Sequence, residues 1–334
     1  MGTKELLYGY KFFRSTLTER EKEIYDQLYK GIVDRKSEVL LAGVSFEQGK
    51  KIVNAILADN PMFFHVDSFS FLAALFSCVI KPIYNMTELQ YQACIPQLEA
   101  AIYAYVNQAQ VHSSSSMEAI RKLHSLIVRK IRYHDDGAAS HTVIGPLVNR
   151  QGVCEGIAKS VKLICDCLRI PSAVIFGTAL TQAKGTRENH AWNAIKADGT
   201  WLYFDFTYDL TLNSSNPCPS LIRYDYFALS LEEISADHSS DLSAIPQGQR
   251  SGNYFRVYNL VVHNQHDLNR LIAKSLSGGS KDAAFKVSEV WRDFSPETAL
   301  QKALSLKAVI TSGFSISYSF SYNNMQRICY VHFD

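Results

Sequence analysis

The pattern of hydrophobic and polar positions predicts a largely helical region over residues 1–112. The segments TERE at 18–21 and SFEQ at 45–48 have the spacing of a capping box, in which two side chains satisfy the first turn of a helix reciprocally. Apolar residues follow each segment at helical spacing, and Pro61 comes where the second of these helices should end. A further helix is expected over about 88–107.

A second region begins at the serine run 113–116, because serine side chains compete with a helix for backbone hydrogen bonds. Ser115 and Glu118 form a fresh capping box there. The pattern from about 116 to 235 predicts a helix, a loop, a helix that starts at Cys154, and then strands around SAVIFGTAL, HAWNAIKA and TWLYFDFTYD.

The C-terminal part follows a polar, turn-rich stretch at 237–253. Its pattern predicts alternating strands and helices, for which a ferredoxin-like order is one interpretation. The expected elements are a strand at 254–262, a helix at 267–276, a strand at 283–287, a helix at 296–310 and a hairpin around Asn323-Asn324.

These elements predict an α+β fold in three domains. We expect a helical N-terminal domain at 1–112, a central domain at 113–240 and a small C-terminal α+β module at 241–334.

Composition and charge narrow the class of protein. The chain has 334 residues, 47% of them hydrophobic and 20% charged, which is typical of a globular protein and excludes a disordered one. A net charge of +2 without blocks of like charge gives no reason to expect nucleic acid as a partner. The most hydrophobic run, at 69–80, is too short to span a membrane. No signal peptide is visible, so a cytoplasmic protein is expected as written, and an extracytoplasmic one if a leader was removed. The oligomeric state is left open.

Three of the seven cysteines lie in the segment QGVCEGIAKSVKLICDC at 151–167. On a helix Cys165 would lie roughly 16 Å along the axis from Cys154, so the two cannot share a metal ion. Cys165 and Cys167 would point to different sides of that helix, and no Cys-x-x-Cys pair occurs in the chain. An odd number of scattered cysteines also argues against a disulfide scaffold. We therefore expect three separate thiols.

The Asp198-Gly199 pair predicts a type I′ hairpin turn between the last two central strands. With that turn, His190 would face Thr207, and Asp205 would be the diagonal neighbour of His190 at roughly 7–8 Å between backbones. A carboxylate in that position can orient an imidazole by accepting a hydrogen bond from one of its nitrogens.

Cys154 is the candidate for a third group, because a helix N-terminus favours a thiolate and can donate a backbone N–H to an oxyanion. Each of the three residues has an ordinary structural interpretation, as a packed thiol, a satisfied polar side chain or a capping residue. Their joint pattern favours a triad of Cys154, His190 and Asp205.

These motifs resemble the core of the transglutaminase-like superfamily. The resemblance rests on GVCEGIAKS, ENHAWNAIKA and WLYFDFTYD, with His190 36 positions after Cys154 and Asp205 15 positions after His190. Softer similarity to bacterial transglutaminase-domain proteins extends over roughly 8–240. The resemblance implies a papain-like α+β core, in which the helix that bears Cys154 packs on an antiparallel sheet. It also implies that Cys154 is the nucleophile, His190 the general base and acid, and Asp205 the orienting carboxylate.

The resemblance also implies acyl transfer from peptide or protein amides through a Cys thioester, by a peptidase, amidase or acyltransferase. The acyl acceptor, water or an amine, stays open. No cofactor or metal is expected, and the partner would be a peptide or protein substrate. The alternative is a catalytically silent binding or scaffolding protein that keeps the fold.

Several other residues have structural interpretations. The YHDD segment at 133–136 is expected to be a solvated loop, and His124 a core residue on a helix. Trp192 should share the face of His190, and His238 is expected in a loop. Asn149 and Gln151 are candidates for a side-chain donor to the oxyanion.

Overall fold

The computed structural model describes five ranges of the chain: 9–74, 77–181, 185–240, 252–310 and 316–334. Contacts between backbone segments divide the chain into two compact units. The first unit comprises residues 1–201 and 239–246, and the second comprises 202–238 and 247–334. The three-domain boundaries expected from the sequence stay a prediction.

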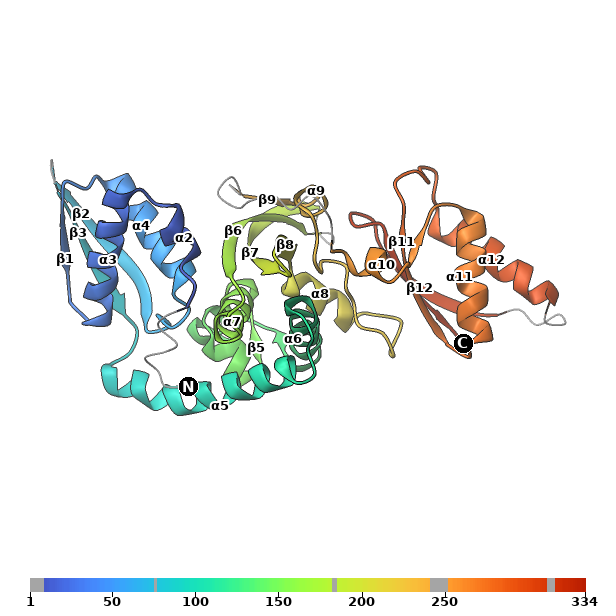
Figure 1. Cartoon of the computed structure of the whole chain (residues 1–334), viewed down its shortest axis with the longest axis horizontal. Coiled ribbons are helices and arrows are strands. Elements are labelled where there is room, and N and C mark those ends of the chain that lie inside the picture. The colour runs from blue at the N-terminus through green and yellow to red at the C-terminus, as the bar shows by residue number, and fades with distance from the viewer. Residues whose placement is uncertain (1–8, 75–76, 182–184, 241–251, 311–315) are drawn as a thin grey trace. The chain divides into compact units, whose positions relative to one another are not determined.

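The N-terminal part of the first unit combines helices with a three-stranded antiparallel sheet of order β1-β3-β2, and α3 and α4 lie on one face of that sheet (Figure 1). The helical N-terminal region is confirmed, as are both capping boxes, but the sheet was not predicted. The elements are α2 (Phe12–Thr16), α3 (Glu19–Val33), β1 (Val39–Ala42), α4 (Phe46–Asp59), β2 (Val66–Ala74), β3 (Ser77–Tyr84) and α5 (Glu88–Gln110).

The central part of the first unit contains the helix that bears Cys154. This helix, α7 (Cys154–Cys167), packs against β6 (Ser172–Thr181) and β7 (Thr186–Ala197). The strands β6 and β7 pair antiparallel in a sheet of order β8-β7-β6-β9. The remaining elements are α6 (Ser116–Lys130), β4 (Arg132–Tyr133), η1 (Ala138–His141), η2 (Gly145–Asn149), β5 (Gln151–Gly152) and β8 (Thr200–Phe204).

The predicted turn between β7 and β8 is confirmed. Asp198 and Gly199 both have positive φ, 45° and 85°, as a type I′ turn requires. The Asp198 carboxylate accepts hydrogen bonds from the backbone N–H and hydroxyl of Ser116, at 2.9 Å and 2.7 Å. The turn is therefore attached to the first residue of α6.

The second unit begins within β8 and continues through α8 (Phe206–Ser214) to a four-stranded sheet of order β10-β11-β13-β12. Apolar side chains of α11 and α12 form one core with the strands of this sheet. The elements are α9 (Leu231–Ile234), β9 (His238–Ser239), α10 (Tyr254–Val257), β10 (Val261–Val262), α11 (Gln265–Ser277), β11 (Asp282–Val287), α12 (Pro296–Ile310), β12 (Tyr318–Asn323) and β13 (Ile328–Phe333).

Two expectations for this sheet were wrong. The segment predicted as one strand at 254–262 is a short helix, α10, followed by β10, because the Asn253 side chain accepts from the Phe255 N–H and caps a turn. The order of elements also differs from a ferredoxin-like βαββαβ module, because α12 separates β11 from β12. The other predicted helices, the strand at 283–287 and the C-terminal hairpin are confirmed.

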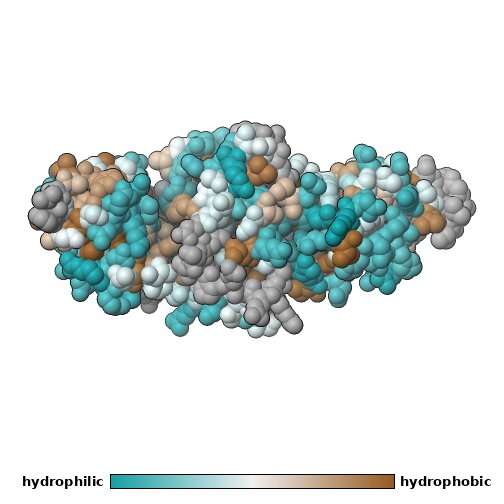
Figure 2. Space-filling model, turned by 90° about the horizontal axis from the view of Figure 1, so that it is seen from above, coloured by the Kyte–Doolittle hydropathy of each residue, from teal (hydrophilic) through white to brown (hydrophobic). Residues whose placement is uncertain are grey.

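Within the described ranges, no helix combines the length and apolar character needed to cross a bilayer. On the face shown in Figure 2, hydrophobic residues form scattered patches among hydrophilic ones. That mixture is ordinary for the surface of a globular protein.

Candidate active site

Cys154 is the first residue of α7, and its side chain is partly exposed. The N-cap residue, Val153, provides no side-chain cap. The first turn of α7 therefore keeps backbone N–H groups that no capping side chain satisfies, and such groups favour an anion. Gly156 allows this turn to lie against η1, because a Cβ there would clash with the Ser140 carbonyl oxygen.

Of the other two cysteines of α7, Cys165 lies in the core, whereas Cys167 is partly exposed like Cys154. Cys165 is buried, and burial raises the pKa of its thiol to about 12. Burial likewise raises the pKa of the Cys167 thiol to about 12. All seven cysteines of the chain are free thiols, so the expectation of three separate thiols in this helix is confirmed.

His190 lies on β7, where it pairs with Gly177 of β6. Its ring stacks beside Trp192, with ring centroids 6.1 Å apart, so the prediction that both share one face is confirmed. The strand is attached to α7 by Asn193, whose side-chain amide donates to the Ala158 carbonyl at 2.9 Å. Ala158 lies one helical turn after Cys154. This buried hydrogen bond holds the start of α7 beside the strand that carries His190.

Asp205 is buried at the N-cap of α8. One carboxylate oxygen, Oδ1, accepts from the backbone N–H groups of Thr207 and Tyr208 at 2.9 Å and 3.0 Å. The register argument was wrong in one respect: β8 ends at Phe204, so Thr207 belongs to a helix and is not a strand residue facing His190. Asp205 is therefore positioned by its role as a helix cap and not by the pleat of a strand.

His238 lies next to Asp205 and is 3% exposed, so the expectation of a loop residue was wrong. Its Nε2 lies 3.0 Å from Asp205 Oδ2, and its Nδ1 lies 2.6 Å from Asp237 Oδ1. The second oxygen of Asp237 accepts from the Tyr226 hydroxyl at 2.5 Å. Burial lowers the pKa of His238, but hydrogen bonds to the two carboxylates outweigh this, and the net effect is a raised pKa.

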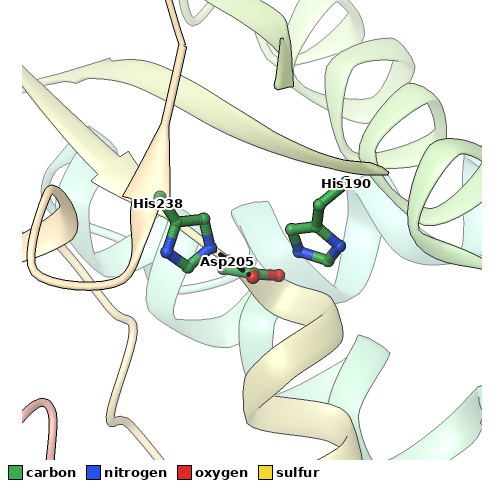
Figure 3. Close-up of side chains that lie close together, drawn as sticks. All are labelled: His190, Asp205 and His238. Atoms are coloured by element: carbon green, nitrogen blue, oxygen red, sulfur yellow. Dashed lines mark hydrogen bonds and ion pairs between the residues drawn. The ribbon is translucent and has the colours of Figure 1, made fainter. Parts of the chain in front are cut away.

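Asp205 lies between His190 and His238 in Figure 3. A ring nitrogen of each histidine and a carboxylate oxygen of Asp205 all lie within 4.8 Å of one another. Such a set could hold a metal ion, but a histidine ligand must be neutral, and a raised pKa favours the imidazolium form of His238. Both nitrogens of His238 already face carboxylate oxygens. The group is therefore described more simply as a hydrogen-bonded network.

Sequence patterns did not point to His238, Asp237 or Tyr226. The adjacent acid and imidazole of "ADH" at 236–238 were the available signal, but nothing in the local pattern shows that they return to Asp205. The YHDD segment is exposed, and His124 is buried on α6, as expected. Neither oxyanion candidate gains support, because the Gln151 amide donates to Asp136 at 2.7 Å and Asn149 is exposed.

A cavity of about 670 Å³ opens beside the start of α7. It is bounded by α2 and α4 on one side and by β6 on the other. The backbone at Tyr10, just before α2, is attached to α7, because Lys162 donates to its carbonyl oxygen at 2.7 Å. The lining includes Leu57, Ile175 and Phe176 as apolar residues, Lys50 and Asn54 as polar ones, and Glu155.

The α+β core, in which a cysteine-bearing helix packs on a curved antiparallel sheet, is a fold of the papain and transglutaminase type. Residues 103–206, from α5 to the start of α8, match the sequence model of the transglutaminase-like superfamily. The chain therefore contains a transglutaminase-like core domain, and the resemblance noted in its sequence is confirmed.

Solved structures give more distant similarities. A transglutaminase matches at 13% identity with a TM-score of 0.30, covering 51% of this chain and 50% of that one. The periplasmic domain of TgpA from Pseudomonas aeruginosa matches at 19% identity with a TM-score of 0.27, covering 40% of this chain and 56% of that one. The chain thus spans about half the length of each of these two. No match was found among curated proteins.

Proposed function

We propose that this protein is a thiol enzyme that transfers or hydrolyses acyl groups of peptide or protein amides. In this proposal Cys154 is the nucleophile, His190 the general base and acid, and Asp205 the carboxylate that orients His190. One observation carries the proposal. The buried carboxylate of Asp205, which caps a helix, has an oxygen within 4.8 Å of a ring nitrogen of His190. The attachment of the His190 strand to the Cys154 helix supports it further.

The chemistry follows from these roles. The Cys154 thiol gives its proton to His190, and the thiolate attacks the amide carbonyl carbon. Collapse of the tetrahedral adduct breaks the C–N bond, and the imidazolium returns the proton to the leaving amine. Water or a second amine then attacks the thioester and gives a proton to His190. The C–S bond breaks, the acid or the new amide is released, and His190 passes its proton to the departing Cys154 sulfur.

The backbone at the start of α7 supports a role in stabilising charge. The first turn presents N–H groups without a side-chain cap, next to the atom where the oxyanion would form. Preorganised donors of this kind lower the energy of a tetrahedral intermediate without reorganising during the reaction.

The cavity beside Glu155 gives a candidate place for a substrate side chain. Glu155 directly follows the proposed nucleophile, and the lining combines apolar side chains with the charged Lys50. We propose that an apolar side chain near the reacting amide enters this cavity, since burial in an apolar pocket is the usual source of binding energy for such a group.

The proposal is tested by the rate at which a small thiol-directed electrophile, iodoacetamide, labels each cysteine near neutral pH. Cys154 should react much faster than the buried Cys165, because only thiolate reacts and burial raises the pKa of Cys165. A His190→Ala change should slow Cys154 labelling at least about tenfold. His134→Ala, in the exposed YHDD loop, is the matched control and should not slow it. Equal labelling of Cys154 and Cys165, or no effect of His190→Ala, would remove the basis of the proposal.

A further inference from the structure

The buried neighbours of Asp205 extend the site beyond three residues. A continuous chain of hydrogen bonds runs from the Tyr226 hydroxyl to Asp237, from Asp237 to the His238 ring, and from that ring to Asp205. All four side chains are buried or nearly so, and all lie between residues 202 and 238. Such a network is costly to bury unless its donors and acceptors match.

The protonation states of the network follow from its geometry. Both nitrogens of His238 face carboxylate oxygens, and only an imidazolium can donate from both. A neutral ring would place a lone pair against Asp205 or against Asp237. The imidazolium therefore offsets the charge of one of the two buried carboxylates, and without it the two would be left as uncompensated charges.

We propose that His238 is a positioning residue of the site. It would be an imidazolium that holds the Asp205 carboxylate in place beside His190 and offsets the negative charge of that carboxylate. This inference rests on the function proposed above. Asp205 can serve both imidazoles, because an ionised carboxylate offers about four acceptor positions. Two of these already accept the Thr207 and Tyr208 N–H groups at the helix cap, and His238 holds the second oxygen.

Two tyrosine rings that carry no charge at neutral pH pack against the His238 ring. The rings of Tyr208 and Tyr226 lie with centroids 5.2 Å and 5.6 Å from that of His238. Burial raises the pKa of Tyr226 well above its usual value, so the hydroxyl stays a donor to Asp237. Burial also raises the pKa of Asp209, on α8, which favours its neutral form. Among the described contacts, the carboxylates that face the His238 ring are those of Asp205 and Asp237, and His190 lies beyond Asp205.

Loss of the His238 imidazolium should raise the pH at which Cys154 forms a thiolate, by either of two routes. If both carboxylates stay ionised, the lost positive charge makes a thiolate nearby less favourable. If Asp205 takes up a proton instead, it holds the imidazolium form of His190 less strongly, and the thiolate loses its counter-ion. Both routes move the formation of the thiolate to higher pH.

The test is the pH profile of Cys154 alkylation by iodoacetamide in the full chain. In His238→Gln the acid limb of the profile should move up by about one pH unit, which corresponds to a roughly tenfold lower rate on that limb. Asp237→Asn should move it in the same direction while keeping an acceptor for the His238 ring, because it removes the charge that favours the imidazolium. Tyr226→Phe should have little effect on the profile, because the Asp237 charge remains.

A merely structural role would give a different pattern. His124 is 1% exposed on α6, and His124→Gln should lower the melting temperature without moving the acid limb. The inference is overturned if His238→Gln, or Asp237→Asn where that variant does not fold, gives the wild-type profile. A separate result would overturn the proposed function instead: His190→Ala, made in the otherwise wild-type chain, leaves the rate of Cys154 labelling unchanged.

Discussion

The helix cap made by Asp205 and the role proposed for its carboxylate can be separated by substitution. Asp205 caps α8 through two backbone N–H groups, and it carries the charge that faces His190 and His238. Asparagine caps a helix as well as aspartate does but has no charge. The two roles of this residue therefore predict different results for two similar variants.

Asp205→Asn should keep most of the stability of the protein and lose at least about tenfold in the rate of Cys154 labelling at neutral pH. Asp205→Ala should lose the same reactivity and, in addition, about 1–3 kcal/mol in the free energy of unfolding, because the cap is also lost. Chemical denaturation and alkylation of the same samples measure both effects. An Asp205→Asn protein that labels at the wild-type rate would show that the charge is not needed.

At the residue scale, the sequence pointed to the right neighbours of Asp205 only in part. The Asp198-Gly199 turn was correct, because two adjacent positions with positive φ leave few alternatives to that dipeptide. The proximity of His190 and Asp205 was expected from strand register but arises from a helix cap. His238 could not be found, because a buried histidine held by two carboxylates has the same local pattern as one in a loop.

Helices were easier to predict than strands at the scale of single elements. The starts of α3, α4 and α6 follow from their capping residues, which carry a local signal. The strands β2 and β3 lie in a short apolar run that fits a helix or a strand equally well by periodicity. Partners distant in sequence decide between the two, and the sequence pattern does not show them.

The cavity between α4, β6 and the start of α7 gives a prediction at the same scale. Asn54 is exposed on α4 and lines the cavity, so Asn54→Trp should fill part of it without disturbing the core. Alkylation of Cys154 by iodoacetamide should be unchanged, while labelling by peptidyl chloromethyl ketones with apolar side chains should slow at least about tenfold.

The matched control for this experiment is Ala93→Trp, at a position on α5 that is also exposed but lies outside the cavity lining. It should leave both rates unchanged. If Asn54→Trp changes the rate of Cys154 labelling by neither reagent, or lowers both rates equally, the cavity is not where the substrate side chain binds.

At the scale of the whole molecule, the transglutaminase-like core occupies only residues 103–206 of the chain. The parts that precede and follow it have cores of their own, one around α3, α4 and the N-terminal sheet and one around α11, α12 and the C-terminal sheet. If the function proposed above is correct, we expect the core to determine the chemistry. We also expect residues outside the core, such as those of α2 and α4 that line the cavity, to influence the choice of substrate.

The central claim is that Cys154 acts on peptide or protein amides. Its most direct test treats a broad protein and peptide library with the wild-type chain and with Cys154→Ala, and scores both cleaved bonds and new isopeptide bonds by mass spectrometry. We predict products of one kind with the wild-type chain and none with Cys154→Ala. Cleavage would identify a hydrolase and crosslinks an acyltransferase. A folded wild-type protein that gives no Cys154-dependent product of either kind would contradict the claim and favour a binding or scaffolding protein.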